Sequence, residues 1–218
     1  RPTGAPEERA NLLVDDSGRL WDLLRTKGCS RLAVLVDNAG TELLMDLALA
    51  DYLLCQDLVE EVQLHLKPHP FFVSDAMAAD VWAGLTALEA AGGPAQEMAE
   101  RVRAQVRRGD LQLRSHWYYG TSLFYFQLPD DLRELLAGAD LVIAKGDVNY
   151  RRLLGDAHWP PPTPFAQAAG YFPAPLVALR TLKAEIIVGL GPGEAERLDA
   201  EDPTWLINGR RGVVQARL

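Results

Sequence analysis

Short apolar runs alternate with helical patterns along most of this chain. The clearest pair is an apolar run at 32–36 followed by a segment at 41–55 whose leucines recur at helical spacing. Helices are also expected before Gly28, after Asp75, at 95–108 and from 129 to 138, and further strands at 59–66, 111–113, 140–144, 184–188 and 213–215. This alternation predicts an α/β fold of three layers (α/β/α), built on a doubly wound, mainly parallel, Rossmann-like sheet.

The N-terminal 29 residues fit this pattern less well. Residues 1–10 are rich in Pro, Gly and Glu, so we expect a loose tail there, followed by one short helix. The chain begins with Arg1 instead of Met, and we expect that an upstream segment is missing. We therefore divide the chain into a tail with a short helix at 1–29 and an α/β domain at 30–218.

Composition limits the class of protein. The formal net charge of -8 disfavours broad binding to nucleic acids or to anionic membranes, because both need a basic face. No apolar run approaches the roughly 20 residues that span a bilayer. Two cysteines, Cys29 and Cys55, are too few for a disulfide framework and are typical of a reduced, cytoplasmic protein. We expect a small molecule as the partner, and composition leaves the oligomeric state open.

Polar side chains follow three of the predicted strands. Asp37 and Asn38 come directly after the run at 32–36, Asp75 follows the run at 59–66, and the block 145–152 (KGDVNYRR) follows the run at 140–144. The carboxyl ends of parallel strands lie at one edge of a sheet, so we expect these groups to share a pocket. Their oxygens suit Mg²⁺ or Mn²⁺, with coordination positions left for water and a substrate phosphate.

Each of these acids also has a simpler interpretation as a helix cap. Ser74 or Asp75 can cap the helix that follows. The turn after Asn38 contains Gly40 and leads into a helix, whose amino end offers an anion site. A haloacid-dehalogenase-type phosphatase needs a second acid two positions after the first, where this chain has Ala39, so that nucleophile motif is absent.

Two further segments are candidates for holding a substrate. Asp147, Asn149 and Arg151 alternate with apolar or aromatic residues, which favours either a loop that grips the hydroxyls of a phosphosugar or an Asx turn that caps a helix at 150–154. Lys183 stands in an RTLK segment before the predicted strand at 184–188. Its ammonium offers a point charge for a transferring phosphoryl group, and the alternative is a solvated basic turn.

Motifs of several other enzyme classes are missing. The glycine-rich segment 189–194 (GLGPGE) lacks the spacing of a dinucleotide fingerprint, and its proline removes a backbone donor, so we interpret it as a tight turn. The four histidines show no zinc-site spacing, and the chain has no G-x-S-x-G nucleophile elbow.

Together these segments resemble the metal-dependent damage-control phosphatase family, and within it the branch of sugar phosphate phosphatases also called acidic residue methyltransferases. The matching motifs are VDNAGTEL at 36–43, KP and SD between 67 and 75, KGDVNYR at 145–151 and RTLK at 180–183. The resemblance covers about 30–218. Members of this branch carry an additional N-terminal helical region, so the resemblance implies that 1–29 is a remnant of it.

The resemblance also implies roles for individual residues. Asp37, Asn38 and Asp75 would bind the metal, which would be Mn²⁺ or else Mg²⁺, Co²⁺ or Ni²⁺, and Asp37 and Lys183 would be catalytic. Glu42 and Asp75 are implied to be possible residues of a methyl-donor site or of the pocket. The residues implied to hold the substrate are Asp37, Asn38, Lys183, Asp147, Val148, Asn149, Tyr150 and Arg151.

Three hypotheses for the function follow. The first is a divalent-metal-dependent phosphatase, a hydrolase of small phosphometabolites such as fructose-1-phosphate or fructose-6-phosphate. The second is an S-adenosylmethionine-dependent protein-glutamate O-methyltransferase. The third is a domain that binds metal or phosphometabolite without turnover. The residues leave open whether Asp37 is a nucleophile or only a metal ligand.

Overall fold

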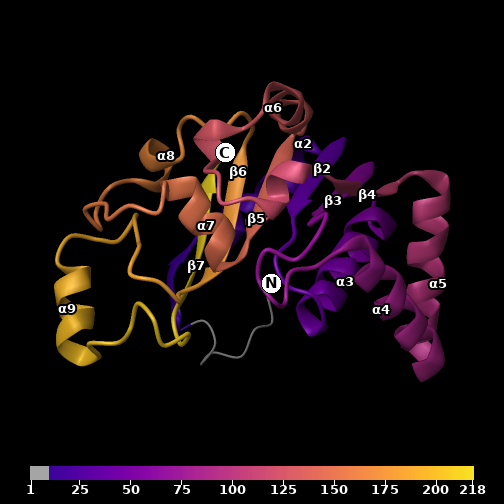
Figure 1. Cartoon of the computed structure of the whole chain (residues 1–218), viewed down its shortest axis with the longest axis horizontal. Coiled ribbons are helices and arrows are strands. Elements are labelled where there is room, and N and C mark those ends of the chain that lie inside the picture. Colours follow the sequence, from indigo (N-terminus) through magenta and orange to yellow (C-terminus); the bar gives the residue numbers. More distant parts are fainter. Residues whose placement is uncertain (1–9) are drawn as a thin grey trace.

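A seven-stranded sheet forms the centre of the computed structural model, which describes residues 10–218. Its strand order is β1-β7-β6-β5-β2-β3-β4, and in Figure 1 it runs from β7 on the left to β4 on the right. Neighbouring strands are parallel except β6 and β7, which are antiparallel. The mainly parallel α/β sheet is therefore confirmed. The loose tail predicted at 1–10 lies, but for its last residue, outside the described residues.

The helices and strands have the following bounds. The strands are β1 (Leu12–Asp15), β2 (Arg31–Leu35), β3 (Glu61–Leu66), β4 (Leu111–Ser115), β5 (Leu141–Lys145), β6 (Leu176–Thr181) and β7 (Gly212–Arg217). The α-helices are α2 (Ser17–Lys27), α3 (Thr41–Cys55), α4 (Ala78–Ala91), α5 (Gly93–Arg108), α6 (Asp130–Ala137), α7 (Gly146–Leu154), α8 (Phe165–Ala168) and α9 (Glu194–Glu201). Two short 3-10 helices are η1 (Trp117–Gly120) and η2 (Tyr125–Gln127).

Two strands differ from the prediction. The strand predicted at 184–188 is wrong, because these residues form an irregular loop and β6 lies earlier, at Leu176–Thr181. The apolar run in that loop is explained by its isoleucines and valine, which pack into the core without joining the sheet. The strand β1, which the pattern did not predict, pairs with β7 and brings part of the N-terminal segment into the same sheet.

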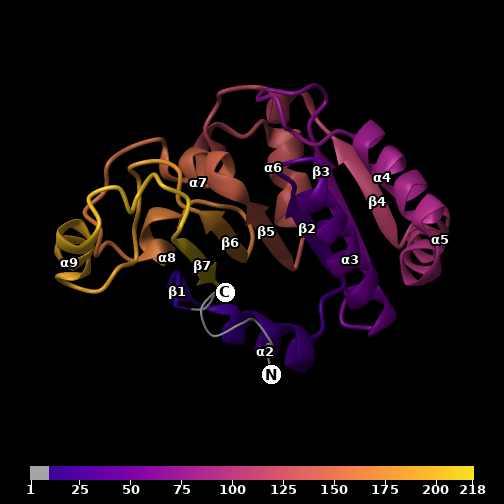
Figure 2. The same cartoon turned by 90° about the horizontal axis from the view of Figure 1, so that it is seen from below.

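Helices cover both faces of the sheet, as the three-layer prediction requires. Alternate residues of β2 show this: Leu32 and Val34 pack in a core with α2, α3, α4 and α5, whereas Ala33 and Leu35 pack in a second core with α6, α7 and α8. Figure 2 shows these layers from a second direction. Strands buried on both faces have continuous apolar runs, which is why the pattern predicted β2 and β5 well. No helix in 10–218 is both long enough and apolar enough to cross a membrane.

The order of the strands reverses between β2 and β5. From β2 the chain moves outward through β3 and β4, then returns to the opposite side of β2 and continues through β5 to β6. In doubly wound sheets the ligand crevice lies outside the carboxyl ends of the strands at such a reversal. Asp37 follows β2 and Gly146 follows β5, so the fold places the strongest sequence candidates at this point.

Candidate active site

A cavity of about 370 Å³ lies at the carboxyl ends of β2, β5 and β6. It brings together Asp37, Asn38, Asp147 and Lys183, which the sequence predicted for one pocket, and also Glu42, which the resemblance linked with a methyl donor or with the pocket. These residues come from three separate segments of the chain, so the cavity exists only in the folded protein.

Asp37 lies at the inner end of this cavity with 7% of its surface exposed. Its backbone oxygen accepts from the amide of Ala76 at 3.0 Å, which ties the end of β2 to the segment before α4. Burial raises the pKa of its carboxyl to about 6, and the negative charges of Glu42 and Asp75 act in the same direction. A buried acid beside other acids is a favourable place for a cation.

Gly146 closes one side of the Asp37 carboxylate. Its φ is +87°, a left-handed conformation that favours glycine, and a Cβ at this position would overlap the carboxylate of Asp37. The close approach lets α7 begin directly beside the acid, so the amino end of that helix faces the cavity. A helix amino end stabilises negative charge, such as that of a phosphate.

Asp75 lies behind the cavity and does not line it. Its Oδ2 accepts from the amides of Phe71 and Phe72, both at 2.8 Å, and its Oδ1 lies 3.5 Å from Nζ of the buried Lys67. The backbones of Asn38 and Asp75 form an isolated β-bridge, so the predicted metal-binding residues are neighbours.

The helix-cap interpretation of Ser74 and Asp75 is wrong. The N-cap of α4 is Met77, whose amide donates to the Asp80 carboxylate at 2.8 Å. Asp75 stabilises the turn before the helix instead, and the hydroxyl of Ser74 donates to Asn38 Oδ1 at 2.6 Å.

Lys145 bridges two acidic residues of α3, Glu42 and Asp46. Its Nζ donates to Glu42 Oε1 at 3.0 Å and to Asp46 Oδ1 at 2.5 Å. Glu42 and Asp46 are four residues apart and therefore share one face of the helix. Burial raises the pKa of the Asp46 carboxyl to about 6, opposed by the adjacent ammonium of Lys145.

The charges of this region fit one divalent cation. When all are ionised, four carboxylates face two ammonium groups and leave an excess of two negative charges; the groups are Asp37, Glu42, Asp46 and Asp75 with Lys67 and Lys145. The Asp37 carboxylate and the Asn38 amide oxygen are hard donors of the kind that Mg²⁺ and Mn²⁺ bind. Within 10–218, however, no three His, Cys, Asp or Glu side chains are arranged to hold a metal ion. For Asp75 to bind a metal, its carboxylate would have to give up its contact with the ammonium of Lys67.

Asp147 is fixed by a buried ion pair on the far side of the cavity. Its Oδ1 accepts from Arg180 Nε at 2.7 Å and from the amide of Lys183 at 3.2 Å. The Arg180 side chain is fully buried and lies 4.4 Å above the ring of Tyr150. It also donates to the carbonyls of Ala184 and Ile186, so it is an anchor for the 181–186 loop.

Lys183 differs from Arg180 because its side chain is exposed at the rim. The RTLK segment lies at the carboxyl end of β6 instead of before a strand, because the predicted strand at 184–188 is absent. Lys183 therefore lies at the same edge of the sheet as Asp37.

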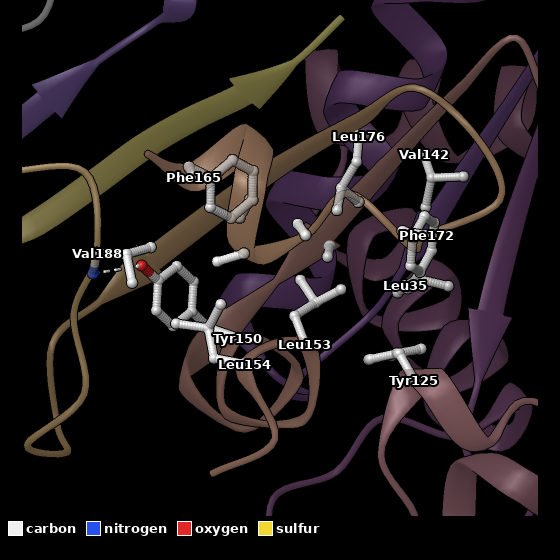
Figure 3. Packing of buried hydrophobic residues seen from close by; sticks show 14 of the residues in the cluster. Leu35, Tyr125, Val142, Tyr150, Leu153, Leu154, Phe165, Phe172, Leu176 and Val188 are labelled. Atoms are coloured by element: carbon white, nitrogen blue, oxygen red, sulfur yellow. Dashed lines mark hydrogen bonds between the residues drawn. The ribbon is translucent and has the colours of Figure 1, made fainter. Parts of the chain in front are cut away.

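Four residues of the DVNYR segment do not line this cavity. Asn149 and Tyr150 are each 1% exposed: Asn149 Oδ1 accepts from Tyr125 at 2.7 Å, and the Tyr150 hydroxyl donates to Gln215 at 2.8 Å. Figure 3 shows the Tyr150 ring among core residues, with its hydroxyl at the amide of Val188. Val148 and Arg151 instead line a separate pocket of about 210 Å³.

This second pocket has aromatic walls. Phe71 and Phe72 come from the turn that holds Asp75, and Phe124 comes from the segment before η2. Arg151 forms an ion pair with Asp156 at 2.7 Å there.

Sequence reasoning missed the roles of Lys67 and Asp46 in supporting the site and the identity of the carboxylate that pairs with Arg180. Asp46 had a usable signal, since it lies four residues after Glu42 on a predicted helix. The position of Lys67 directly after a strand was a second signal. The ion pair of Arg180 had none, because its partner is 33 positions earlier in the chain.

Comparisons with known proteins identify the family of the chain. Residues 5–198 match the profile of the damage-control phosphatase ARMT1-like domain. The chain is similar to damage-control phosphatase ARMT1 of Mus musculus (37% identity, 94% of this chain and 49% of the relative) and of Xenopus tropicalis (39%, 94% and 49%). It is also similar to that of Homo sapiens (37%, 94% and 49%). The chain thus spans about half the length of the curated relatives it matches.

The fold is also found in a solved structure. A DUF89 family protein from Pyrococcus horikoshii aligns with a TM-score of 0.53 at 17% identity, covering 94% of this chain and 53% of that one. At this identity the likeness is one of fold.

Proposed function

The chain belongs to the ARMT1-like damage-control phosphatase family, and from this premise we propose that it is a divalent-metal-dependent phosphatase of small phosphorylated metabolites. The observation that carries the proposal is the cavity at the strand-order reversal, where the buried Asp37 and the exposed Lys183 face one space. The excess of carboxylates around Asp37 favours binding of a metal cation. The ammonium of Lys183 at the rim favours binding of a phosphate.

Asp37 and Asn38, with Asp75, would hold the metal, which supplies Lewis acidity toward the phosphoryl oxygens when bound. Lys183 would offset charge that develops on the phosphoryl group in the transition state. The amino end of α7 would bind phosphate oxygens through backbone amides of the DVNYR segment. The buried side chains of Asn149 and Tyr150 would act indirectly, by holding that helix against the core.

We further propose hexose phosphates, such as fructose-1-phosphate or fructose-6-phosphate, as substrates and Mn²⁺ as the preferred metal. Three polar groups on the cavity wall support a polyhydroxylated ligand: the carboxylates of Asp147 and Glu42 and the amide of Asn38. Carboxylates accept hydrogen bonds from hydroxyls, so Asp147 would orient the sugar beside Lys183. Val148 and Arg151 would contact only a substrate that extends into the neighbouring aromatic pocket.

Methyl transfer is not part of this proposal. Glu42, which the resemblance linked with a methyl donor, is hydrogen-bonded to Lys145 and Asn38 and so belongs to the same polar network as Asp37. No observation on the described residues favours a nucleoside-binding site over a phosphate site here.

Phosphate release from fructose-1-phosphate and fructose-6-phosphate tests the proposal. We expect turnover with Mn²⁺, loss of turnover with EDTA, and a loss of at least about a hundredfold in Asp37→Asn, since one electrostatic group at a reacting centre contributes that much. Asp22→Asn, an exposed change on α2, is the matched control and should keep full activity. Unchanged turnover in Asp37→Asn would exclude this site as the active site.

A further inference from the structure

The side-chain amide of Asn38 is held in one orientation. Its Nδ2 donates to Asp37 Oδ2 at 2.8 Å and to Glu42 Oε2 at 2.9 Å, while its Oδ1 accepts from the hydroxyl of Ser74 at 2.6 Å. Turning the amide by 180° would place its oxygen against two carboxylates and its nitrogen against the Ser74 hydroxyl. Two charge-assisted hydrogen bonds would be replaced by repulsion.

Glu42 is itself fixed in place. It lies in the first turn of α3, and its other carboxylate oxygen accepts from Lys145 Nζ at 3.0 Å. The ammonium of Lys145 is held in turn by Asp46 at 2.5 Å. The Glu42 carboxylate therefore presents one oxygen to Lys145 and the other to Asn38, with little freedom to rotate.

We propose that Glu42 is a positioning residue that fixes the Asn38 amide so that its oxygen, which accepts one hydrogen bond from Ser74, keeps its second lone pair for a divalent cation. The inference rests on the proposed function, because it concerns the same site. Its chemical basis is that an amide oxygen carries lone pairs for a cation, whereas the amide nitrogen is only a donor. Partners that orient a ligand in this way commonly change metal affinity by 10- to 100-fold.

The structure offers a matched pair of variants. Glu42→Gln and Asp46→Asn each remove one negative charge beside Lys145, but only the first changes a partner of Asn38. In Glu42→Gln the ammonium of Lys145 takes the new amide oxygen, which leaves a nitrogen donor facing Asn38 Nδ2. We expect Mn²⁺ affinity, measured by titration calorimetry on the metal-free protein, to fall about 10- to 100-fold in Glu42→Gln. Asp46→Asn removes an equal charge but leaves both partners of Asn38 Nδ2 in place, so its loss of Mn²⁺ affinity should be clearly smaller than that of Glu42→Gln.

An Asn38→Asp background gives a second readout. A carboxylate has an oxygen on either side, so its orientation no longer matters to a cation. Glu42→Gln should therefore cost little Mn²⁺ affinity in that background. The new carboxylate also repels the neighbouring acids, so the positioning effect is the non-additivity beyond that of Asp46→Asn measured in the same background. Thermal unfolding of each variant confirms that the fold is intact.

Three results would overturn the inference: equal loss of affinity in Glu42→Gln and Asp46→Asn, wild-type affinity in Glu42→Gln, or a full loss that persists in the Asn38→Asp background. The first would mean that charge alone matters. Failure of the proposed function has a different signature, which is Mn²⁺ binding that depends on Glu42 without phosphate release from any sugar phosphate.

Discussion

The backbone of Gly146 lies directly against the carboxylate of Asp37, with no room for a Cβ between them. Asp37 follows β2 and Gly146 follows β5, the two neighbouring strands where the order of the sheet reverses. The contact therefore brings the first acid of the site to the amino end of α7.

Gly146→Ala should inactivate the protein. A Cβ would overlap the Asp37 carboxylate, and φ at this position is +87°, so the side chain adds strain of about 1–3 kcal/mol. We expect a lower free energy of unfolding in urea and loss of phosphate release. Gly18→Ala on α2, which meets no atom within 4 Å, is the control and should leave both quantities unchanged or slightly improved. Full activity in Gly146→Ala would contradict the close approach.

Lys183→Ala should lower the phosphatase activity without lowering the stability of the fold. The side chain is exposed at the cavity rim, so its removal should leave the melting temperature nearly unchanged. We expect kcat/KM to fall about a hundredfold, because a cation that faces the phosphoryl group is lost. Lys183→Arg should recover part of the activity. The exposed Lys27→Ala is a matched control, and equal activity in the two alanine variants would remove Lys183 from the mechanism.

Asp147→Ala should destabilise the fold. It removes the carboxylate that pairs with Arg180, whose side chain is fully buried, and such a loss costs about 3–5 kcal/mol. Denaturant unfolding measures it. Glu201→Ala breaks the exposed pair with Arg197 and should cost less than about 0.5 kcal/mol. Similar values for the two variants would show that the buried pair does not stabilise the loop after β6.

Tyr150→Phe tests whether this tyrosine acts on the substrate or on the core. The variant loses a hydrogen bond to Gln215 at 2.8 Å and one from the amide of Val188 at 3.3 Å. Unsatisfied buried partners cost about 1–3 kcal/mol, so the free energy of unfolding should fall. We expect KM for a sugar phosphate to stay unchanged. A raised KM with unchanged stability would assign the hydroxyl to substrate binding instead.

His65 should make the protein sensitive to acid. Burial lowers its pKa from 6.5 to about 3, and its Nδ1 is 2.6 Å from the Tyr119 hydroxyl. Because the folded state keeps the ring neutral while the unfolded state takes up a proton below pH 6.5, stability is lost as pH falls from 6.5 toward 3. At pH 5 the loss is about 2 kcal/mol. His65→Gln should lose less stability than the original protein between pH 7 and pH 5, and equal slopes would contradict the neutral buried ring.

The sequence by itself determined the fold class and the strands at the centre of the sheet, because these depend on patterns within short segments of the chain. Strands buried on both faces are continuous apolar runs, so β2 and β5 could be predicted from the sequence. Polar residues follow each of them directly. Parallel strands carry their carboxyl ends to one edge, so grouping Asp37, Asn38 and Asp147 required only the order of elements. The resemblance to a family added roles that the pattern alone left open.

Tertiary structure decided which of these side chains face the cavity. Asp147 and Tyr150 are three positions apart on the same side of α7, and both contact Arg180. Asp147 lies in the first turn and lines the cavity, whereas Tyr150 lies one turn further along and is in the core. The apolar residues 184–188 predicted a strand because burial produces the same pattern in a loop, whereas the sequence analysis did not predict β6, which carries the arginine that anchors Asp147. Ion pairs between distant segments leave no periodic trace in a sequence, so only the folded chain places Lys145 between Glu42 and Asp46.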